Sequence, residues 1–305
     1  MTHSPLAIHG DAMVRDRGRF VFGPLDLQVP YGEVLAVVGP NGSGKTTLFK
    51  LLLGAAYVDS GELRVAGQKP GEAGHLVAAV LDAEYLIPDW TVSDAEAAIA
   101  PFYPSWDRSI FEHVVAQLDV PAGAKIKELS RGEHSKLKLA LALAPSPSVL
   151  LLDEPTSGLD PLAREQVLLV MRQFMASGDR SVVFSTHISQ DLDTVSDQIV
   201  VLRDGQCVHK GTMAQLSRDF VGVSGPSGVM AELSSTVIGM RAVGAGSMVG
   251  GGAGDVVSGV VPVDEFGQIP PSRLHGVRCG EPTVDDVIKA LAVEPPHRFE
   301  RVAAS

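Results

Sequence analysis

The chain has 305 residues, of which 45% are apolar and 20% charged, and its 25 Lys and Arg against 36 Asp and Glu give a formal net charge of −11. A chain of this length and apolar content can bury a core of its own, which excludes global disorder. The acidic balance argues against broad nucleic-acid binding, which needs clustered cations, but a single nucleotide can still be bound by backbone amides.

Neither a secretory signal nor a membrane span is predicted. The first residues, MTHSPLAIHGD, contain no apolar segment typical of a signal peptide. The longest run without Asp, Glu, Lys, Arg or His covers fourteen residues, Leu139 to Leu152, and two prolines interrupt it. Cys207 and Cys279 match no zinc or disulfide framework, which favours a reducing compartment. We therefore expect a cytoplasmic protein that acts on a membrane only through a partner.

The first half of the chain predicts a strand, a helix and then a helical region. Residues 12–38 alternate short apolar runs with turn residues and end in EVLAVVG, which predicts a strand leading into a glycine-rich turn. The segment TTLFKLLLGAAY then reads as a helix. Between about residues 83 and 145 the apolar positions follow a helical period, as at Phe111, Val115 and Leu118.

The second half predicts two buried strands and a hairpin. VLLLDE (149–154) and SVVFSTH (181–187) are continuous apolar runs of the kind found in strands that are buried on both faces. A helix is expected from about Arg164 to Ala176. Residues 198–211 form a hairpin in this interpretation, because Asp204-Gly205 suits a tight two-residue turn.

After about residue 216 the composition changes. Six of the eleven residues from Gly244 to Gly254 are glycine, which indicates a flexible loop. A valine-rich segment (256–263) and an amphipathic helix in PTVDDVIKALA, with Thr283 as its N-cap, follow. We interpret residues 217–305 as a small accessory module, loosely coupled to the rest.

The segment GPNGSGKTT fits the phosphate-binding pattern G-x-x-x-x-G-K-[ST] and lies between a predicted strand and a predicted helix. Its backbone amides and the helix N-terminus can enclose phosphates. Lys45 would reach the β- and γ-phosphates, and the Thr46 hydroxyl would bind Mg²⁺. The predicted nucleotide-binding residues are Gly39, Pro40, Asn41, Gly42, Ser43, Gly44, Lys45, Thr46 and Thr47.

The carboxylates that end VLLLDE complement this loop. Asp153 can hold the Mg²⁺ shell, and Glu154 can polarise a water for in-line attack on a phosphate. Two solvated acids at a strand end are the alternative. A phosphate loop in the same chain favours the catalytic interpretation.

A second candidate phosphate contact is LSRGE (129–133), directly before an apolar helix. Ser130 and Glu133 have the spacing of a helix capping box. Ser130, the Gly132 amide and the helix dipole could equally bind a phosphate, and one helix N-terminus can serve both purposes.

Taken together, GPNGSGKTT, LSRGE, VLLLDEPTSGLD and STH, in this order over residues 6–215, resemble the nucleotide-binding subunit of an ABC transporter. The resemblance implies an α/β fold: a P-loop, RecA-like core over 6–216 with a helical subdomain at about 83–145, plus the C-terminal module. It implies a head-to-tail homodimer or heterodimer in which Ser130 and Gly132, beside Glu133, contact the γ-phosphate of the other subunit. Asp160 would link the two sites, and His187 would hold the γ-phosphate within its own subunit.

Three features depart from the family pattern. Arg131 and Glu133 replace a glycine and a glutamine in LSRGE, and both replacements are compatible with activity. The aromatic residue that stacks on adenine in the family has no exact match here; Phe20 and Phe22 are the candidates, and the alternative is that they are apolar residues of a strand. The family's glutamine ahead of IPDWTV is replaced by Asp82, with Glu84 as the alternative replacement. We predict that Asp82 binds the metal; the alternative is that it faces solvent in the loop.

The resemblance implies an ATPase with ATP and Mg²⁺ as cofactors, on the inner face of the cell membrane, that powers export through separately encoded membrane permease subunits. No nucleic-acid partner is expected. The alternative is a non-transport ABC ATPase that acts on ribosomes or DNA. The single ATPase unit, the absence of a long coiled coil and the acidic balance disfavour it.

Overall fold

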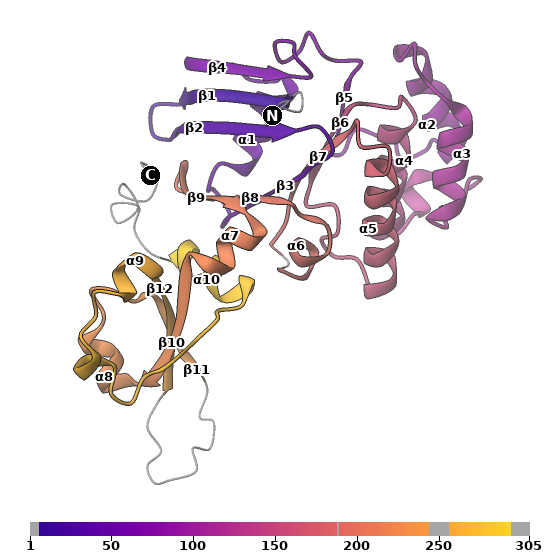
Figure 1. Ribbon diagram of the computed structural model, residues 1–305. Coiled ribbons are helices and arrows are strands. Elements are labelled where there is room, and N and C mark those ends of the chain that lie inside the picture. The colour runs from indigo at the N-terminus through magenta and orange to yellow at the C-terminus, as the bar shows by residue number, and fades with distance from the viewer. Residues whose placement is uncertain (1–5, 188, 244–255, 294–305) are drawn as a thin grey trace.

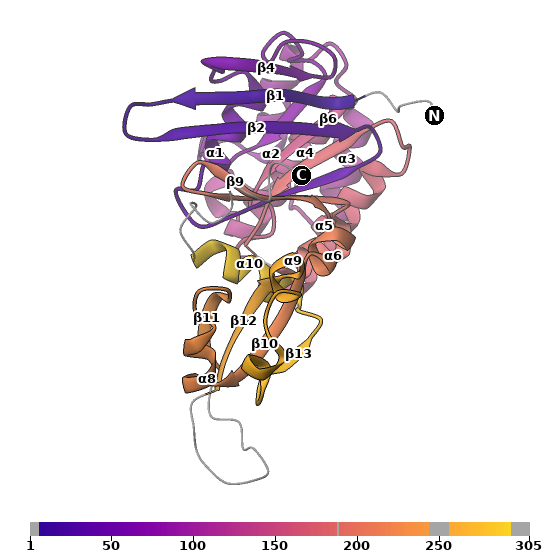
Figure 2. The same ribbon diagram turned by 60° about the vertical axis from the view of Figure 1, so that its left-hand side comes forward.

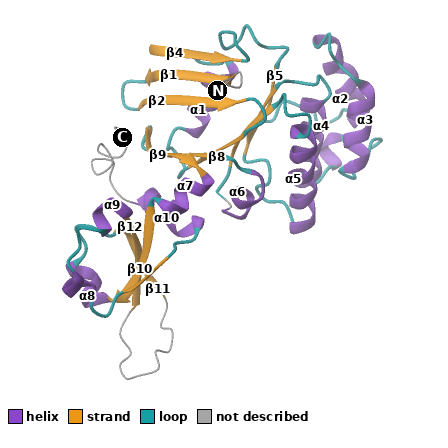
Figure 3. Cartoon of the chain, in the orientation of Figure 1, coloured by secondary structure: helices purple, strands orange, loops and turns teal. Residues whose placement is uncertain are grey.

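The computed structural model describes residues 6–187, 189–243 and 256–293. The glycine-rich segment Gly244–Gly254, Ile188 and the last twelve residues of the proposed module lie outside the described residues. Three sheets and several helices form the described part (Figures 1 and 3). Within it, no helix has the length and apolar character needed to cross a membrane.

The central sheet has six strands, and all neighbours in it are parallel except the last pair. In spatial order they are β5 (Val77–Val80), β6 (Val149–Asp153), β7 (Ser181–Ser185), β3 (Val34–Val38), β8 (Gln198–Arg203) and β9 (Gln206–Thr212). The apolar runs at 149–154 and 181–187 form strands, as their composition predicted. The carboxyl ends of β3, β6 and β7 meet at one edge, which is where open α/β sheets bind ligands.

A second sheet and one helix cover one face of the central sheet. The second sheet is antiparallel and consists of β2 (Val21–Pro30), β1 (Leu6–Asp16) and β4 (Ser60–Val65). The helix α1 (Lys45–Leu53) contributes the buried side chains of Leu48 and Phe49, which pack with Leu35 and Val37 of β3.

Helices cover the opposite face, where Ala36 and Val38 of β3 pack (Figure 1). The region expected to be helical from residue 83 begins later, because residues 83–91 form loops and turns. Short polar side chains cap most of these helices, with Thr91, Asp107, Ser130 and Asp160 at N-cap positions. The helical elements are α2 (Val92–Ile99), η1 (Ala100–Phe102), α3 (Arg108–Gln117), η2 (Ile126–Glu128), α4 (Arg131–Leu143), α5 (Pro161–Met175) and α6 (Ser189–Val195).

The C-terminal part contains a four-stranded antiparallel sheet of its own, in the order β11-β12-β10-β13. Two strand–helix–strand units build it, as in the split β-α-β arrangement. Helices α8 and α9 pack on one face around Val223, Met230 and Val261. The elements are α7 (Met213–Arg218), β10 (Phe220–Pro226), α8 (Ser227–Glu232), β11 (Ile238–Val243), β12 (Val256–Pro262), α9 (Val263–Phe266), η3 (Pro271–Leu274), β13 (Arg278–Gly280) and α10 (Val284–Val293).

The helix α10 joins this sheet to the rest of the chain (Figure 2). It contacts β11 and β12 on one side and α6, α7 and β8 on the other. Its buried side chains Val287, Ala290 and Leu291 belong to the same apolar cluster as Leu192. The expectation of a loosely coupled module is therefore wrong, because part of its apolar surface is shared with the core of the preceding residues.

Candidate functional site

The turn between β3 and α1 has the backbone geometry that its glycines predicted. Gly39 has φ 153° and approaches β8 so closely that a Cβ would lie 2.1 Å from the Leu202 carbonyl oxygen. Gly44 caps α1 with φ 111°, and a Cβ there would lie 2.9 Å from the Phe22 ring. Only glycine allows this close wrapping of the loop backbone, whose amides can enclose an anion.

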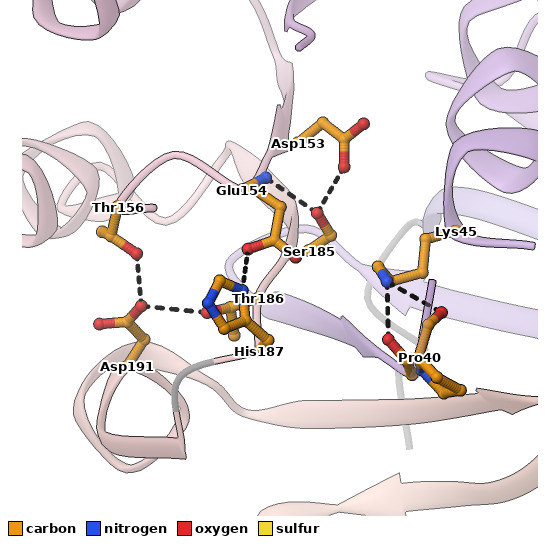
Figure 4. A network of polar contacts seen from close by, with 10 residues as sticks. Pro40, Lys45, Asp153, Glu154, Thr156, Ser185, Thr186, His187 and Asp191 are labelled. Atoms are coloured by element: carbon orange, nitrogen blue, oxygen red, sulfur yellow. Dashed lines mark hydrogen bonds and ion pairs between the residues drawn. The ribbon is translucent and has the colours of Figure 1, made fainter. Parts of the chain in front are cut away.

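Lys45 begins α1 and folds back over the loop. Its Nζ donates to the carbonyl oxygens of Gly39, at 2.6 Å, and Pro40, at 3.3 Å (Figure 4). The side chain is 9% exposed, so the ammonium group is held beside the loop rather than in bulk water. A cation in this position can meet phosphates that the loop encloses.

A pocket of about 570 Å³ opens next to this loop. It brings together residues that lie far apart in the sequence: the phosphate loop, both acids at the carboxyl end of β6, and Asp82. Arg17 and Phe20, from the turn between β1 and β2, complete it, and sequence reasoning gave Arg17 no role. The full lining is Arg17, Phe20, Asn41, Gly42, Ser43, Gly44, Lys45, Thr46, Thr47, Asp82, Asp153 and Glu154.

The two acids at the carboxyl end of β6, Asp153 and Glu154, are held by Ser185, the last residue of the neighbouring strand β7. The Ser185 hydroxyl donates to Oδ1 of Asp153 at 2.6 Å and accepts from the Glu154 N–H at 2.9 Å (Figure 4). Glu154 has a φ of 53°, which is a left-handed backbone conformation. Non-glycine residues rarely adopt it, and those that do are often at functional sites. Ser185 lies directly before Thr186 and His187, and its place in that motif was the available signal for its role.

His187 follows β7 and meets Glu154. Its Nδ1 lies 2.6 Å from Oε2 of Glu154, while the His187 side chain is 62% exposed and that of Glu154 24% exposed. The imidazole therefore bridges the proposed catalytic carboxylate and the solvent. The sequence motif indicated a functional histidine, and the structure adds its partner.

A buried carboxylate supports this corner from behind. Asp191, in α6, is fully buried, and its Oδ2 accepts from the hydroxyls of Thr156, at 2.6 Å, and Thr186, at 3.1 Å (Figure 4). Its Oδ1 accepts from Nε of Arg164 in α5 at 2.5 Å. These bonds tie the segment after Glu154 to the residue before His187, and sequence reasoning missed them.

The LSRGE segment forms the capping box that its spacing predicted. Glu133 N–H donates to the Ser130 hydroxyl at 3.2 Å, and Ser130 N–H donates to the Glu133 carboxylate at 2.8 Å. The hydrogen bond from the Ser130 backbone, together with the Ser130 hydroxyl, lowers the pKa of Glu133. The predicted capping box is therefore confirmed. Phosphate binding by the same helix N-terminus stays a prediction.

The residues expected to act on a second subunit do not line the pocket. Ser130, Gly132, Glu133 and Asp160 are absent from the described lining. A Cβ on Gly132 would meet Leu159 at 3.3 Å, and a Cβ on Gly158 would meet the Arg131 guanidinium at 3.5 Å, so LSRGE lies against SGLD. Asp160 caps α5, and the backbone N–H groups of Ala163 and Leu162 hold its pKa below the ordinary value.

In the loop before α2, the two acids that could replace the family's glutamine lie in different surroundings. Asp82 lines the pocket, whereas Glu84 points to α4, with its oxygens 3.2 Å from Nζ of Lys138 and 3.3 Å from Nε2 of His134. Burial lowers the pKa of His134. Of the two acids, only Asp82 is positioned to face a nucleotide.

A resident metal site made of protein ligands alone is not present in the described part of the chain, where no three His, Cys, Asp or Glu side chains gather suitably. The pocket does offer the Thr46 hydroxyl and the carboxylates of Asp153 and Asp82. Oxygen donors suit Mg²⁺, which usually takes one or two protein ligands and completes its shell with phosphate and water. The donor set therefore fits Mg²⁺ bound together with a nucleotide.

The structure also separates Phe20 from Phe22. Phe22 is fully buried in the cluster beneath α1. Phe20 is half-buried and lines the pocket beside the phosphate loop. Of these two rings, only that of Phe20 lines the pocket.

Known proteins are similar to this chain in sequence and in fold. A family model described as "ABC transporter" matches residues 22–157. The "Nod factor export ATP-binding protein I" of Burkholderia orbicola is 32% identical over 213 residues, covering 67% of this chain and 70% of the relative, and that of Paraburkholderia xenovorans is 30% identical over 226 residues, covering 71% and 74%. A solved ATP-binding subunit of an ABC transporter has a TM-score of 0.63 at 24% identity, covering 70% of this chain and 92% of that one. A dimeric ATP-binding cassette in a post-hydrolysis state, bound to ADP and Pi, has a TM-score of 0.61 at 20% identity, covering 68% and 98%.

Proposed function

This chain belongs to the family of ABC transporter ATP-binding subunits and is an ATPase, and we propose that it hydrolyses ATP in the pocket between Phe20 and Glu154 to power export. The observation that carries the proposal is the meeting of the phosphate loop, Asp153, Glu154 and His187 at one sheet edge. We also propose that the chain consists of an ATPase unit (6–216) and a C-terminal module (217–305).

In the proposed reaction, Lys45 and the loop amides bind the β- and γ-phosphates, and Phe20 stacks on the adenine. Glu154 accepts a proton from the attacking water, which adds to the γ-phosphorus as the bond to the β-phosphate oxygen breaks. Ser185 holds Asp153 and the Glu154 backbone in place. His187, whose Nδ1 contacts Glu154, would hold the γ-phosphate through the exposed part of its ring.

Mg²⁺ would be held by Thr46 and Asp153, with Asp82 as a further ligand, either direct or through water. When bound, it would neutralise phosphate charge. The three acids in this pocket support that assignment, because a triphosphate placed beside them without a cation would meet strong repulsion.

A second ATPase subunit is part of the proposal. The pocket within one chain lacks a contribution from LSRGE, while Ser130 and Gly132 lie at the exposed N-terminus of α4, available to another copy. Such a helix start is suited to an anion. We propose a head-to-tail dimer, with an identical or related partner, in which this segment closes the other subunit's site.

Membrane permease subunits are the proposed partners on the inner face of the cell membrane. A pocket of about 310 Å³ lies beside the Asp82 loop and is lined by apolar residues of α1, β5 and the following loop, including Leu53 and Tyr85. Tyr85, Ile87 and Phe102 are exposed nearby in sequence. Apolar surface of this kind marks contact with a partner protein. The names of the relatives describe export. This supports a role in transport over a role on ribosomes or DNA.

The Lys45→Ala variant tests the assignment of this pocket. It removes the cation nearest the phosphates, so we expect loss of ATP binding or turnover, measured by nucleotide titration and phosphate release. Lys50→Ala, in the last turn of the same helix, is the matched control and should keep wild-type activity. Equal ATPase rates for wild type and Lys45→Ala would overturn the pocket assignment.

A further inference from the structure

Two carboxylates hold the chain on either side of His187. Before it, Thr186 donates to Asp191, which is fully buried. After it, the hydroxyl of Ser189 donates to Oδ1 of Asp285 at 2.5 Å. Asp285 belongs to α10, 96 residues further along the chain, so one of the two restraints comes from the C-terminal module.

The helix that carries Asp285 is itself fixed at both ends. At its start, the Thr283 hydroxyl accepts from the Asp286 N–H at 3.1 Å, and Asp286 pairs with Arg241 of β11. Near its end, Arg203 of β8, which is 4% exposed, donates to the Leu291 carbonyl oxygen at 3.0 Å. The Asp285 carboxylate is therefore presented to Ser189 from a well-anchored element.

The helix α6 passes this restraint to the catalytic corner. Ser189 begins α6, and Asp191 lies in the same first turn. Through Asp191 the helix reaches Thr156 and Thr186, and so both the segment after Glu154 and the residue before His187. Fixing Ser189 thus limits how far His187 can move from its 2.6 Å contact with Glu154.

The geometry points to Asp285 as a positioning residue for ATP hydrolysis: by holding Ser189, the C-terminal module keeps His187 at Glu154. This inference rests on the proposed roles of Glu154 and His187 and assigns the module a function in them. Asp285 touches neither the substrate pocket nor His187, so its effect passes through Ser189 and α6. Such a residue changes turnover more than ATP affinity, because Lys45 and the phosphate loop are untouched.

The test uses the full-length chain and steady-state ATPase kinetics. Ser189→Ala removes the donor and Asp285→Ala the acceptor. We expect each to lower kcat by about three- to tenfold with little change in KM for ATP, and the double variant to be no slower than either single one. Asp285→Asn should retain most activity, because its amide oxygen still accepts from Ser189. Lys289→Ala, which removes the solvent-side partner of Asp285 at 2.6 Å, is the matched control and should keep wild-type kcat.

Several outcomes would overturn the inference: wild-type kcat in Ser189→Ala, effects that multiply in the double variant, or a Lys289→Ala variant as slow as Asp285→Ala. Thermal melting shows whether a variant with low kcat is still folded. If Asp285→Ala does not fold, the test rests on the comparison of Ser189→Ala with Ser189→Thr, which keeps the hydroxyl. A Glu154→Gln variant measured in parallel distinguishes failure of the positioning role from failure of the proposed catalytic roles. If Glu154→Gln is inactive while Ser189→Ala and Asp285→Ala are normal, only the positioning role fails; if Glu154→Gln is fully active, the proposed catalytic roles fail.

Discussion

His187 and Glu154 are joined by a 2.6 Å contact between Nδ1 of the imidazole and Oε2 of the carboxylate. A neutral imidazole that donates from Nδ1 to the carboxylate keeps Nε2 for a second partner. The pair thus places a proton-accepting group and an orienting group side by side at the end of neighbouring strands β6 and β7. This arrangement explains why the acid and the histidine, 33 residues apart, act as one unit in the proposed reaction.

Glu154→Gln should keep ATP binding and arrest turnover. The amide cannot take a proton from water, and loss of a general base costs roughly 10²- to 10⁴-fold in rate. Phosphate release and nucleotide titration measure the two properties separately. Glu232→Gln, on the exposed surface of α8, is the control for removal of a negative charge. Weakened ATP binding with normal turnover would contradict the role of Glu154.

The Glu154→Gln protein should also form an ATP-dependent dimer, because ATP that is not hydrolysed would hold two subunits together through LSRGE. Ser130→Arg on this background should abolish the dimer by placing bulk where the γ-phosphate must lie. Ser130→Thr keeps a hydroxyl for the helix cap and is the control. Size-exclusion chromatography with saturating Mg-ATP measures the outcome, and a monomer for Glu154→Gln would count against the shared site.

Phe20→Ala and Phe22→Ala should fail in different ways. Loss of base stacking at Phe20 should weaken ATP binding by roughly tenfold with little effect on stability. Removing the fully buried Phe22 ring should lower the free energy of unfolding by roughly 3–5 kcal/mol. Nucleotide titration and denaturant unfolding of both variants check this, and a normal ATP affinity for Phe20→Ala would remove its assigned role.

Asp82→Ala should raise the Mg²⁺ concentration needed for half-maximal ATP hydrolysis, because a carboxylate is lost from the pocket. Glu84→Ala is the matched control from the same loop, since Glu84 contacts Lys138 and His134 instead. Asp82→Gln should retain hydrolysis and change its response to the membrane partner. Superimposable Mg²⁺ titrations for wild type and Asp82→Ala would leave Asp82 as an exposed loop residue without a metal role.

Truncation after Arg218 should destabilise the ATPase unit. It removes α10, whose Val287 and Leu291 are fully buried in the cluster that includes Leu192 of α6. Leu291→Ala in the full chain should by itself cost roughly 2–5 kcal/mol of unfolding free energy. Thermal melting compares the three proteins, and a truncated protein as stable as the full chain would show that the shared packing contributes little.

Features that depend on neighbouring residues could be predicted from the amino-acid sequence. The glycines at 39 and 44, the lysine that follows them, the apolar strands that end at Asp153 and Ser185, and the Ser130–Glu133 cap are all encoded within a few positions. Local backbone geometry and strand burial leave such short segments few alternatives. The fold class and the ATPase family could be predicted for this reason.

Contacts between distant segments could not be predicted in this way, because they depend on how the whole chain packs. Phe20 and Phe22 are both aromatic residues beside one turn, and packing beneath α1 buries Phe22 and leaves Phe20 at the pocket. Likewise, Glu84 pairs with Lys138 of α4, whereas Asp82 lines the pocket. The module was expected to be loosely coupled because its composition changes, yet α10 buries Val287 and Leu291 in a cluster that includes residues of α6 and β8. That burial brings Asp285 to Ser189, a pairing that no local pattern encodes, since hydrophobic packing fixes it across 96 residues.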